Sequence, residues 1–421
     1  MKFYLKGSLN DKLVVQPPPS KSYAQRALLA ASLSEGRSRV ILSGQEPDDV
    51  KVFKRALRSM GVKIRGDEVE GTIPEPPENV INMKYNGTGL RFMTAYSTLA
   101  SKGYVVLTGY SSLVKRPVGP LVEAINELGG WSLALGEGGK PPVIVKGQRM
   151  KGGDVEIKAS ESSQYVSALL LVSPLNKERT KITWKNRVSE HYVSMTLWVM
   201  KEFGVAPEVE GESFIVYPGV YRASTFQVPA DASSSSFFVS LSIMSEKEVL
   251  IKGLKEEPPQ ADLLGLTSVL EEAGIKFSFI DEGLYVYGKI PDKPIHANLK
   301  DSPDLFPALS VLGCVVPVKI TGIEHIKYKE SNRIASMASE LSKLGCKVKA
   351  SENDFYAEPG SLRKEAELYG WKDHRVVMAL SVLCLSLGIK CRINGYEHVK
   401  KSFPSFFEEL RKNGAEAVAY A

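Results

Sequence analysis

Apolar residues follow one repeated pattern along the chain: an amphipathic helix, then a glycine, then a short strand. In its first copy the helical residues Val52 to Leu57 precede Gly61 and the strand-like run Val62 to Ile64. Five further copies carry their glycine at Gly129, Gly204, Gly274, Gly345 and Gly414, so the intervals are 68, 75, 70, 71 and 69 residues. Each glycine stands where a helix end needs a left-handed residue, which glycine adopts at no steric cost. The spacing predicts six α/β units, three in each half of the chain.

The stretch from Pro19 to Arg26 combines a predicted helix start with two cations. Three prolines, Pro17 to Pro19, end a short apolar strand because proline has no amide donor. A helical face is then predicted from Ala24, Ala27, Leu28 and Ala31. Ser20 or Ser22 can cap this helix, and Lys21 and Arg26 lie where unpaired amides and the helix dipole favour an anion. The stretch fits a phosphate or carboxylate site, and a capped surface helix with solvated cations fits it equally well.

Further polar clusters, several of them rich in cations, lie mostly at the starts of other predicted helices. They are Asn86 to Arg91, Lys115 to Pro117, Ser160 to Gln164, Ser189 to Tyr192, Asp301 to Asp304, Lys329 to Arg333, Asp373 to Arg375 and Lys400 to Pro404. A plain turn or cap explains each one alone. At Asp304, which follows a proline early in its helix, the dipole favours the carboxylate form, as a general base requires. Their recurrence predicts several positive helix ends directed into one space.

Composition narrows the class of protein. The chain has 421 residues, of which 43% are apolar and 24% charged, so at least two globular domains are expected. The net charge of +6 suits anionic small molecules at least as well as nucleic acid. No apolar run is long enough to span a bilayer, and the first residues are too charged for a signal peptide. The four cysteines are predicted to be buried free thiols in a reducing cytoplasm, and no metal or cofactor is expected because ligand spacing is missing.

Taken together, the motifs resemble those of the 5-enolpyruvylshikimate-3-phosphate synthase family over essentially the whole chain. They occur in the order Pro-Ser-Lys-Ser-x3-Arg, Asn-Gly-Thr-Gly-x-Arg, Arg-Pro, Ser-Ser-Gln, Lys-Glu-Ser-x-Arg, Asp-His-Arg and Lys-Ser-Phe-Pro. The resemblance implies an α/β fold of two domains, each of three βαβαββ repeats around a pseudo-threefold axis, with helix N-termini facing the cleft. Residues 1–18 and 228–421 would form the domain with the base, the acid and most phosphoenolpyruvate-binding cations. Residues 19–227 would form the domain with most of the shikimate 3-phosphate site.

The resemblance also implies a reaction and the residues for it. The enolpyruvyl group of phosphoenolpyruvate would pass to the 5-hydroxyl of shikimate 3-phosphate, with phosphate released, in aromatic amino acid biosynthesis. The catalytic residues would be Asp304 as base, Glu330 as acid and Lys21. Shikimate 3-phosphate would be held by Lys21, Ser22, Arg26, Ser162, Ser163, Gln164, Ser189, Tyr192, Asp304 and Lys329. Phosphoenolpyruvate would be held by Lys21, Gly87, Arg116, Gln164, Arg333, Arg375 and Lys401.

Three departures and two rival functions accompany this hypothesis. The glycine motif is one residue shorter than usual in the family, Asn332 replaces an aspartate, and His325 replaces an asparagine. The sister family that transfers enolpyruvate to UDP-N-acetylglucosamine usually has Lys-Asn and a cysteine before the arginine; here the pair is Lys21-Ser22, and residues 103–116 contain no cysteine. A repeat protein that binds RNA would interleave basic residues with exposed aromatics. We expect small-molecule partners only, without nucleic acid or membrane, in a cytoplasmic monomer.

Overall fold

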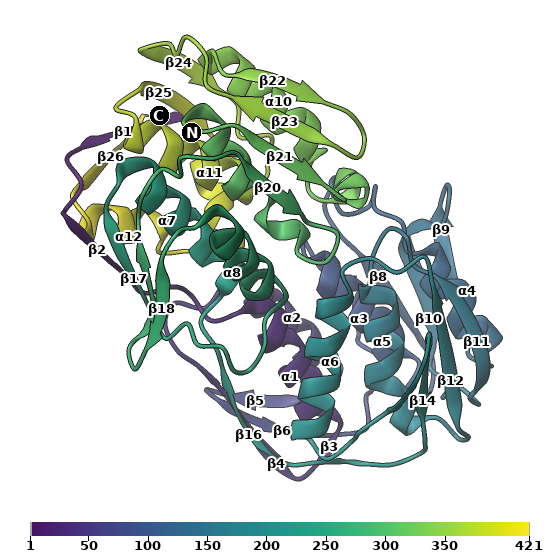
Figure 1. Ribbon diagram of the computed structural model, residues 1–421. Coiled ribbons are helices and arrows are strands. Elements are labelled where there is room, and N and C mark those ends of the chain that lie inside the picture. Colours follow the sequence, from purple (N-terminus) through teal and green to yellow (C-terminus); the bar gives the residue numbers. More distant parts are fainter. Residues whose placement is uncertain (1, 421) are drawn as a thin grey trace. The chain divides into compact units, whose positions relative to one another are not determined.

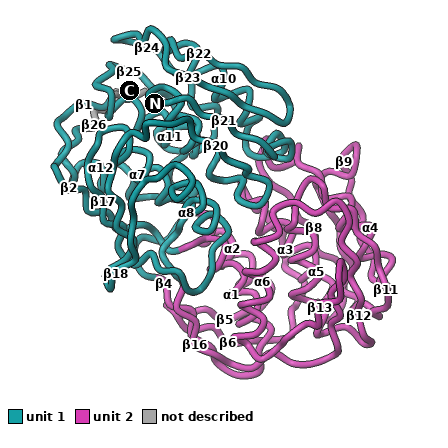
Figure 2. Tube along the Cα trace, in the orientation of Figure 1, with its two compact units in different colours: residues 1–19, 43–47, 229–421 teal, residues 20–42, 48–228 magenta. Residues whose placement is uncertain are grey.

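The computed structural model describes residues 2–420, which form two compact units (Figures 1 and 2). Unit 1 comprises Met1–Pro19, Ser43–Pro47 and Pro229–Ala421, and unit 2 comprises Ser20–Leu42 and Asp48–Val228. Both are built from four-stranded sheets and helices, as the α/β prediction requires.

Unit 2 contains three four-stranded sheets of identical pairing. They are β16 (Thr225–Val228), β4 (Arg37–Leu42), β6 (Glu68–Glu70) and β5 (Lys63–Arg65); β7 (Ile81–Asn82), β8 (Tyr104–Thr108), β10 (Lys140–Lys146) and β9 (Ser132–Gly136); and β11 (Gly153–Lys158), β12 (Thr180–Lys185), β14 (Ser213–Val216) and β13 (Glu208–Glu210). In each sheet the first two strands pair in parallel and the other two pairings are antiparallel. A short pair, β15 (Tyr221–Arg222) with β3 (Ser34–Glu35), adds to them. The helices are α1 (Lys21–Leu33), α2 (Asp48–Ser59), α3 (Gly87–Ser97), α4 (Gly119–Glu127), α5 (Gln164–Val172) and α6 (Glu190–Glu202).

Unit 1 repeats the same sheet three more times. Its sheets are β2 (Lys12–Val15), β17 (Glu248–Lys252), β19 (Gly283–Tyr287) and β18 (Phe277–Ile280); β20 (Ile295–Asn298), β21 (Val318–Thr321), β23 (Phe355–Glu358) and β22 (Lys347–Ala350); and β24 (Glu365–Leu368), β25 (Lys390–Asn394), β1 (Lys2–Gly7) and β26 (Ala415–Tyr420). Its helices are α7 (Ala232–Ser245), α8 (Ala261–Ala273), α9 (Phe306–Ser310), α10 (Arg333–Leu344), α11 (His374–Ser386) and α12 (Phe406–Lys412). The prediction of three βαβαββ repeats in each half of the fold is confirmed.

The six glycines of the sequence repeat occupy the helix ends that the pattern predicts. Their φ angles lie between 73° at Gly274 and 98° at Gly414, in the region that favours glycine. The chain then enters an outer strand of each sheet, β5, β9, β13, β18, β22 or β26. The glycines therefore mark the same turn six times.

Strands far apart in the sequence complete the sheets. In unit 2, β16 pairs with β4, and in unit 1, β2 pairs with β17. Strand β1 lies between β25 and β26. The N-terminal segment is therefore part of the same unit as the C-terminal half.

Two helices of unit 1 are buried around almost their whole circumference, although both contain polar residues. In α7 every residue from Ala232 to Met244 is buried, and in α11 every residue from His374 to Leu385 is buried. Both helices therefore lie inside unit 1, and an aspartate caps the start of each, Asp231 for α7 and Asp373 for α11.

The prediction of free thiols was wrong. Cys314 pairs with Cys346 and Cys384 with Cys391, so none of the four cysteines is free. The Cα atoms lie 5.4 Å and 6.1 Å apart, within the range that a disulfide spans. Separations of 32 and 7 residues did not show that the fold brings these side chains together.

Candidate active site

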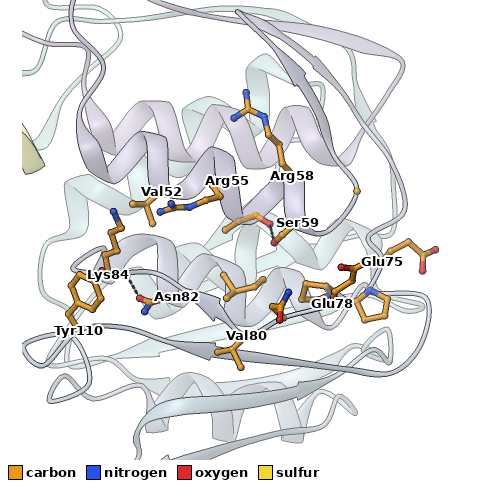
Figure 3. A pocket seen from close by; sticks show the side chains of 16 residues that line it. Val52, Arg55, Arg58, Ser59, Glu75, Glu78, Val80, Asn82, Lys84 and Tyr110 are labelled. Carbon is orange, nitrogen blue, oxygen red and sulfur yellow. Dashed lines mark hydrogen bonds between the residues drawn. The ribbon is translucent and has the colours of Figure 1, made fainter.

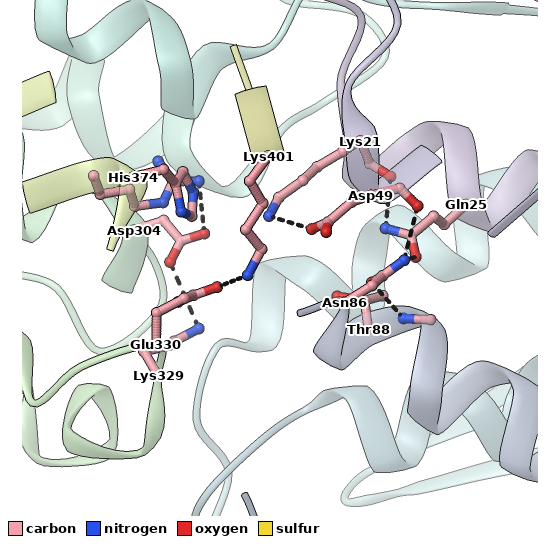
Figure 4. A network of polar contacts seen from close by, with 12 residues as sticks. Lys21, Gln25, Asp49, Asn86, Thr88, Asp304, Lys329, Glu330, His374 and Lys401 are labelled. Atoms are coloured by element: carbon pink, nitrogen blue, oxygen red, sulfur yellow. Dashed lines mark hydrogen bonds and ion pairs between the residues drawn. The ribbon is translucent and has the colours of Figure 1, made fainter. Parts of the chain in front are cut away.

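Helix α1 carries the first predicted cations of unit 2. Its cap is Ser20, whose hydroxyl oxygen accepts the amide of Tyr23 at 3.4 Å, so the alternative cap Ser22 is not used. Lys21 Nζ lies 3.1 Å from Oδ2 of Asp49, a buried residue in the first turn of α2 (Figure 4). The pairing holds the lysine at the start of α1.

Arg26 is buried and joins α1 to α6. Its Nε donates to Thr196 Oγ1 at 2.7 Å, its Nη1 to the Ser22 carbonyl at 2.9 Å and its Nη2 to the Tyr192 carbonyl at 3.0 Å. Burial lowers the pKa of Arg26 to about 10, and the nearby Tyr192 and Tyr23 act in the opposite direction. The guanidinium remains charged at neutral pH, and it binds two other predicted substrate residues, Ser22 and Tyr192.

Gly87 begins α3, and the end of a neighbouring arginine lies where a side chain at this position would be. A Cβ atom at this position would lie 2.7 Å from Nη1 of Arg116 and 3.3 Å from Nη1 of Arg91. Asn86 caps the helix by accepting the Gly89 amide at 2.8 Å. The shortened glycine motif thus still starts a helix and brings its backbone against the Arg116 guanidinium.

Gln164, the first residue of α5, is fixed by two residues of the glycine motif. Its Oε1 accepts from Arg91 Nη1 at 2.5 Å, and its Nε2 donates to Thr88 Oγ1 at 2.8 Å. The Ser162 hydroxyl accepts the Gln164 amide at 3.2 Å. Thr88 and Arg91 belong to a motif that the sequence singled out, but neither was assigned a role. Arg91 also donates to the Pro117 carbonyl at 3.1 Å.

The remaining predicted residues of unit 2 lie at starts of the same helices. Ser163 is the residue before α5, and it is buried. Ser189, the residue before α6, has a left-handed backbone with φ 57°. The starts of α1, α3, α5 and α6 therefore supply all of the predicted residues of this unit except Arg116, which lies beside Gly87.

Unit 1 holds the predicted base among three cations. Asp304 Oδ1 lies 2.8 Å from Arg333 Nη1 and 3.6 Å from Lys329 Nζ, and its Oδ2 lies 3.0 Å from Arg375 Nη2. Figure 4 shows the Asp304 carboxylate and Lys329. Opposite charges at this range favour the ionised carboxylate, the form in which Asp304 can accept a proton.

Glu330, the predicted acid, is also paired with cations. It accepts from Arg333 Nη2 at 2.9 Å and forms a very short contact with Lys401 Nζ (Figure 4). Both side chains are close to fully buried. The two cations that pair with the predicted acid are therefore among the groups predicted to bind phosphoenolpyruvate.

Asp373, which the sequence did not assign, organises the arginines. Its carboxylate accepts from Arg333 Nε at 2.9 Å and from the Arg375 amide at 2.9 Å, which makes it the cap of α11. Burial lowers the pKa of Arg333, but the carboxylates of Asp373, Glu330 and Asp304 outweigh it and raise the pKa above its ordinary value. For Arg375 burial is likewise outweighed, chiefly by Asp304. Both arginines stay charged although they are buried.

Arg375 keeps donor capacity for a ligand. Its Nε and Nη1 are buried and have no hydrogen-bond partner among residues 2–420. Unpaired buried donors are costly in a folded protein, and an anion would satisfy them.

A family model described as EPSP synthase (3-phosphoshikimate 1-carboxyvinyltransferase) matches residues 7–410. The chain belongs to the EPSP synthase family. A 3-phosphoshikimate 1-carboxyvinyltransferase of Korarchaeum cryptofilum is 36% identical over 410 residues, which are 96% of each chain. One from Methanocaldococcus jannaschii is 32% identical over 412 residues, again 96% of each chain.

Solved structures share the fold of this EPSP synthase family member. The EPSP synthase of Acinetobacter baumannii superposes with a TM-score of 0.80 at 24% identity, covering 99% of this chain and 100% of that one. The enolpyruvyl transferase NikO of Streptomyces tendae superposes with a TM-score of 0.75 at 15% identity, covering 99% and 98%. The fold prediction is confirmed, the chain is an enzyme of the transferase class, and the UDP-N-acetylglucosamine alternative is not favoured.

Two departures from the family pattern have a structural explanation. Asn332 caps α10 by accepting the Ala335 amide at 3.2 Å, as an aspartate would. His325 is buried near Asp304 and Lys329, and burial, assisted by Lys329, lowers its pKa to about 3. His325 is therefore a neutral side chain at physiological pH.

A pocket of about 760 Å³ lies elsewhere in unit 2, on α2 and the segment that leads to α3 (Figure 3). Among the described residues that line it, which include Arg55, Asn82 and Tyr110, none is a predicted site residue.

Within residues 2–420 no group of three or more histidine, cysteine or acidic side chains could hold a metal ion. The helices of the same residues include none with the length and apolarity that crossing a bilayer requires.

Proposed function

We propose that the site residues described above carry out the reaction of the EPSP synthase family, and that the two units contribute different residues to it. The residues of unit 2 would bind shikimate 3-phosphate through Lys21, Ser22, Arg26, Ser162, Ser163, Gln164, Ser189 and Tyr192. From unit 1, Asp304 and Lys329 would contact its ring. Buried cations and hydroxyls at four helix starts suit a phosphate ester with several hydroxyl groups.

Phosphoenolpyruvate would be bound by Lys21, Gly87, Arg116, Gln164, Arg333, Arg375 and Lys401. The observation that carries the proposal is that the acid–base pair Asp304 and Glu330 is interleaved with the buried cations Arg333, Arg375 and Lys401. Guanidinium groups bind carboxylates and phosphates in pairs of hydrogen bonds. Fixed cations also offset the repulsion between two anionic substrates.

In the addition step Asp304 takes the proton of the 5-hydroxyl while the oxygen bonds to C2 of phosphoenolpyruvate. Glu330 gives a proton to the methylene carbon, which becomes a methyl group, and a tetrahedral intermediate results. In the elimination step the bond from C2 to the phosphate oxygen breaks and a methyl proton returns to Glu330. The proton held by Asp304 leaves with the phosphate, so both carboxyl groups regain their starting state.

Glu330 can act as an acid only when it is protonated, yet its contacts with Arg333 and Lys401 favour the carboxylate. We propose that the anionic groups of phosphoenolpyruvate compete for these two cations. Once they do, the charged form of Glu330 loses its stabilisation, and its affinity for a proton rises. Substrate binding would thus prepare the acid for the first step.

Phosphate release from phosphoenolpyruvate tests the function directly. Release that depends on shikimate 3-phosphate supports the proposal, and release that depends on UDP-N-acetylglucosamine would replace it by the sister reaction. A cytoplasmic location, a monomeric state and the lack of a nucleic-acid partner stay predictions.

A further inference from the structure

Two of the six repeats carry a buried glutamate where the other four carry a small or apolar residue. Five residues before the helix-ending glycine, the first four repeats have Ala56, Ala124, Val199 and Val269, all buried. At the same position the last two have Glu340, with 0% of its surface exposed, and Glu409, with 3%. Burial of a carboxylate is unfavourable unless hydrogen bonds compensate for the lost water. The two buried glutamates therefore indicate a function that is specific to α10 and α12.

Both glutamates accept a backbone amide from a segment that leads into a substrate helix. Glu340 Oε2 accepts the Tyr369 amide at 2.9 Å, and Glu409 Oε2 accepts the Gln16 amide at 2.9 Å. Each glutamate is also paired with the lysine three residues later, Lys343 or Lys412. Tyr369 stands five residues before α11, and Gln16 stands five residues before α1. One arrangement is thus used twice.

The segment before α11 has a backbone that needs such support. Trp371 and Lys372 have φ angles of 52° and 54°, which side chains other than glycine rarely adopt. Glu340 Oε1 accepts the indole Nε1–H of Trp371 at 2.9 Å, so one carboxylate holds the segment at two points. The Gly370 amide donates to Asn394 Oδ1 at 2.7 Å. These bonds fix the two left-handed residues from both sides.

Immediately after them come the residues of the anion site. The Asp373 amide donates to the Gly370 carbonyl at 2.9 Å, and the Asp373 carboxylate binds Arg333 and caps α11 at Arg375. Arg333 is the first residue of α10, the helix that carries Glu340 two turns later (Figure 1). Helix α10 therefore binds both ends of the segment 369–373, Tyr369 through Glu340 and Asp373 through Arg333.

We propose that Glu340 is a positioning residue for phosphoenolpyruvate: it holds residues 369–372 so that Asp373 and Arg375 present their donors to the ligand. The inference rests on the proposed assignment of Arg333 and Arg375 to phosphoenolpyruvate. Glu340 itself touches neither substrate.

The test compares steady-state kinetics and melting temperature of Glu340→Gln, Trp371→Phe and the double variant. Glu340→Gln keeps the size of the side chain but turns one acceptor into a donor. We expect the KM for phosphoenolpyruvate to rise roughly tenfold, as for the loss of one bond to a buried charge. The KM for shikimate 3-phosphate should stay within about twofold, and the double variant should be less than additive because both changes break the same bond. Glu271→Gln, the same exchange at an exposed position of α8, is the matched control and should change nothing.

Two outcomes would overturn the positioning role: equal rises in both KM values, or a lower melting temperature with both KM values unchanged. If Glu340→Gln does not fold, Trp371→Phe carries the same comparison. Arg375→Lys separates this inference from the function that it rests on. An unchanged KM for phosphoenolpyruvate in Arg375→Lys would refute the assignment of that arginine. A raised KM there, beside unchanged values in the Glu340 and Trp371 variants, would refute positioning alone.

Discussion

At the scale of single residues, the proposed mechanism depends on two carboxyl groups, Asp304 and Glu330, whose cationic neighbours would also bind a substrate. Asp304→Asn should lower kcat by roughly 10²–10⁴-fold, the usual contribution of one positioned proton acceptor. Glu330→Gln should do the same for the proton donor. Binding of both substrates, followed by calorimetry, should persist because the cations remain. Full turnover in either variant would remove that residue from the mechanism.

Gly87→Ala tests how closely the backbone of α3 approaches the Arg116 guanidinium. The added methyl group would lie 2.7 Å from Arg116 Nη1, so the flexible end of that arginine must move. Overpacking of this kind typically costs about 1–3 kcal/mol. We expect a raised KM for phosphoenolpyruvate and a nearly unchanged KM for shikimate 3-phosphate. Identical kinetics would show that Arg116 does not bind phosphoenolpyruvate from this position.

His325 should make the fold sensitive to mild acid. Its pKa is about 3 in the folded protein and 6.5 as a free side chain, so between these values the unfolded chain binds more protons. The free energy of unfolding should therefore fall as the pH falls below 6.5, by about 1.4 kcal/mol per pH unit from this residue. His325→Gln should remove this part of the slope. Between pH 6.5 and pH 5, the free energy of unfolding measured by urea titration should fall by about 1.6 kcal/mol more in the unchanged protein than in the variant. Equal slopes would contradict the buried neutral state.

At the scale of helices and strands, the sequence predicted what local backbone chemistry determines. The glycines at 61 and 345 end their helices, and Ser20, one of the two predicted caps, caps α1, because these features depend on neighbours within a few residues. Asp304 and Glu330 could also be predicted as candidate site residues, because each belongs to a motif of the sequence.

Contacts between elements could not be predicted in this way. Two examples follow from the packing of α10 beside the start of α11. Asp373 binds Arg333, and Glu340 holds Trp371, whose backbone is left-handed. The two disulfides are also contacts between elements. Each needs two elements to meet, which spacing along the chain does not reveal.

Removing a disulfide should weaken unit 1. Cys314–Cys346 closes a loop of 32 residues, and the loss of such a link typically lowers the free energy of unfolding by about 2–4 kcal/mol. Cys346→Ala should therefore melt at a lower temperature than the unchanged protein. A reducing agent should lower the melting temperature of the unchanged protein by more than that of the variant, which keeps only the Cys384–Cys391 disulfide. No effect of reductant on the unchanged protein would mean that the cysteines are not paired in solution.

At the scale of the molecule, the two units differ in how far apart along the chain their partners lie. Apart from residues 43–47, unit 2 is drawn from 20–228, whereas β1 and β2 of unit 1 pair with strands that follow much later. Chains arrested on the ribosome just after unit 2 has emerged should already resist protease within residues 48–228. Protection of residues 2–7, which form β1, should appear only once β25 and β26 have been made. Simultaneous protection of both regions would contradict this order of folding.

During synthesis, β1 must wait for β25 and β26, the last strands to be made. At typical rates of translation roughly 20–80 s pass before about 400 residues are complete. Through that interval β1 has no partner, and β2 has none until β17 is made, so that both strands can pair with another polypeptide. Lys12 within β2 and the three prolines that follow it are the residue types that discourage such pairing. The prolines that lead into α1 would thus also act as gatekeepers against aggregation while the chain is being made.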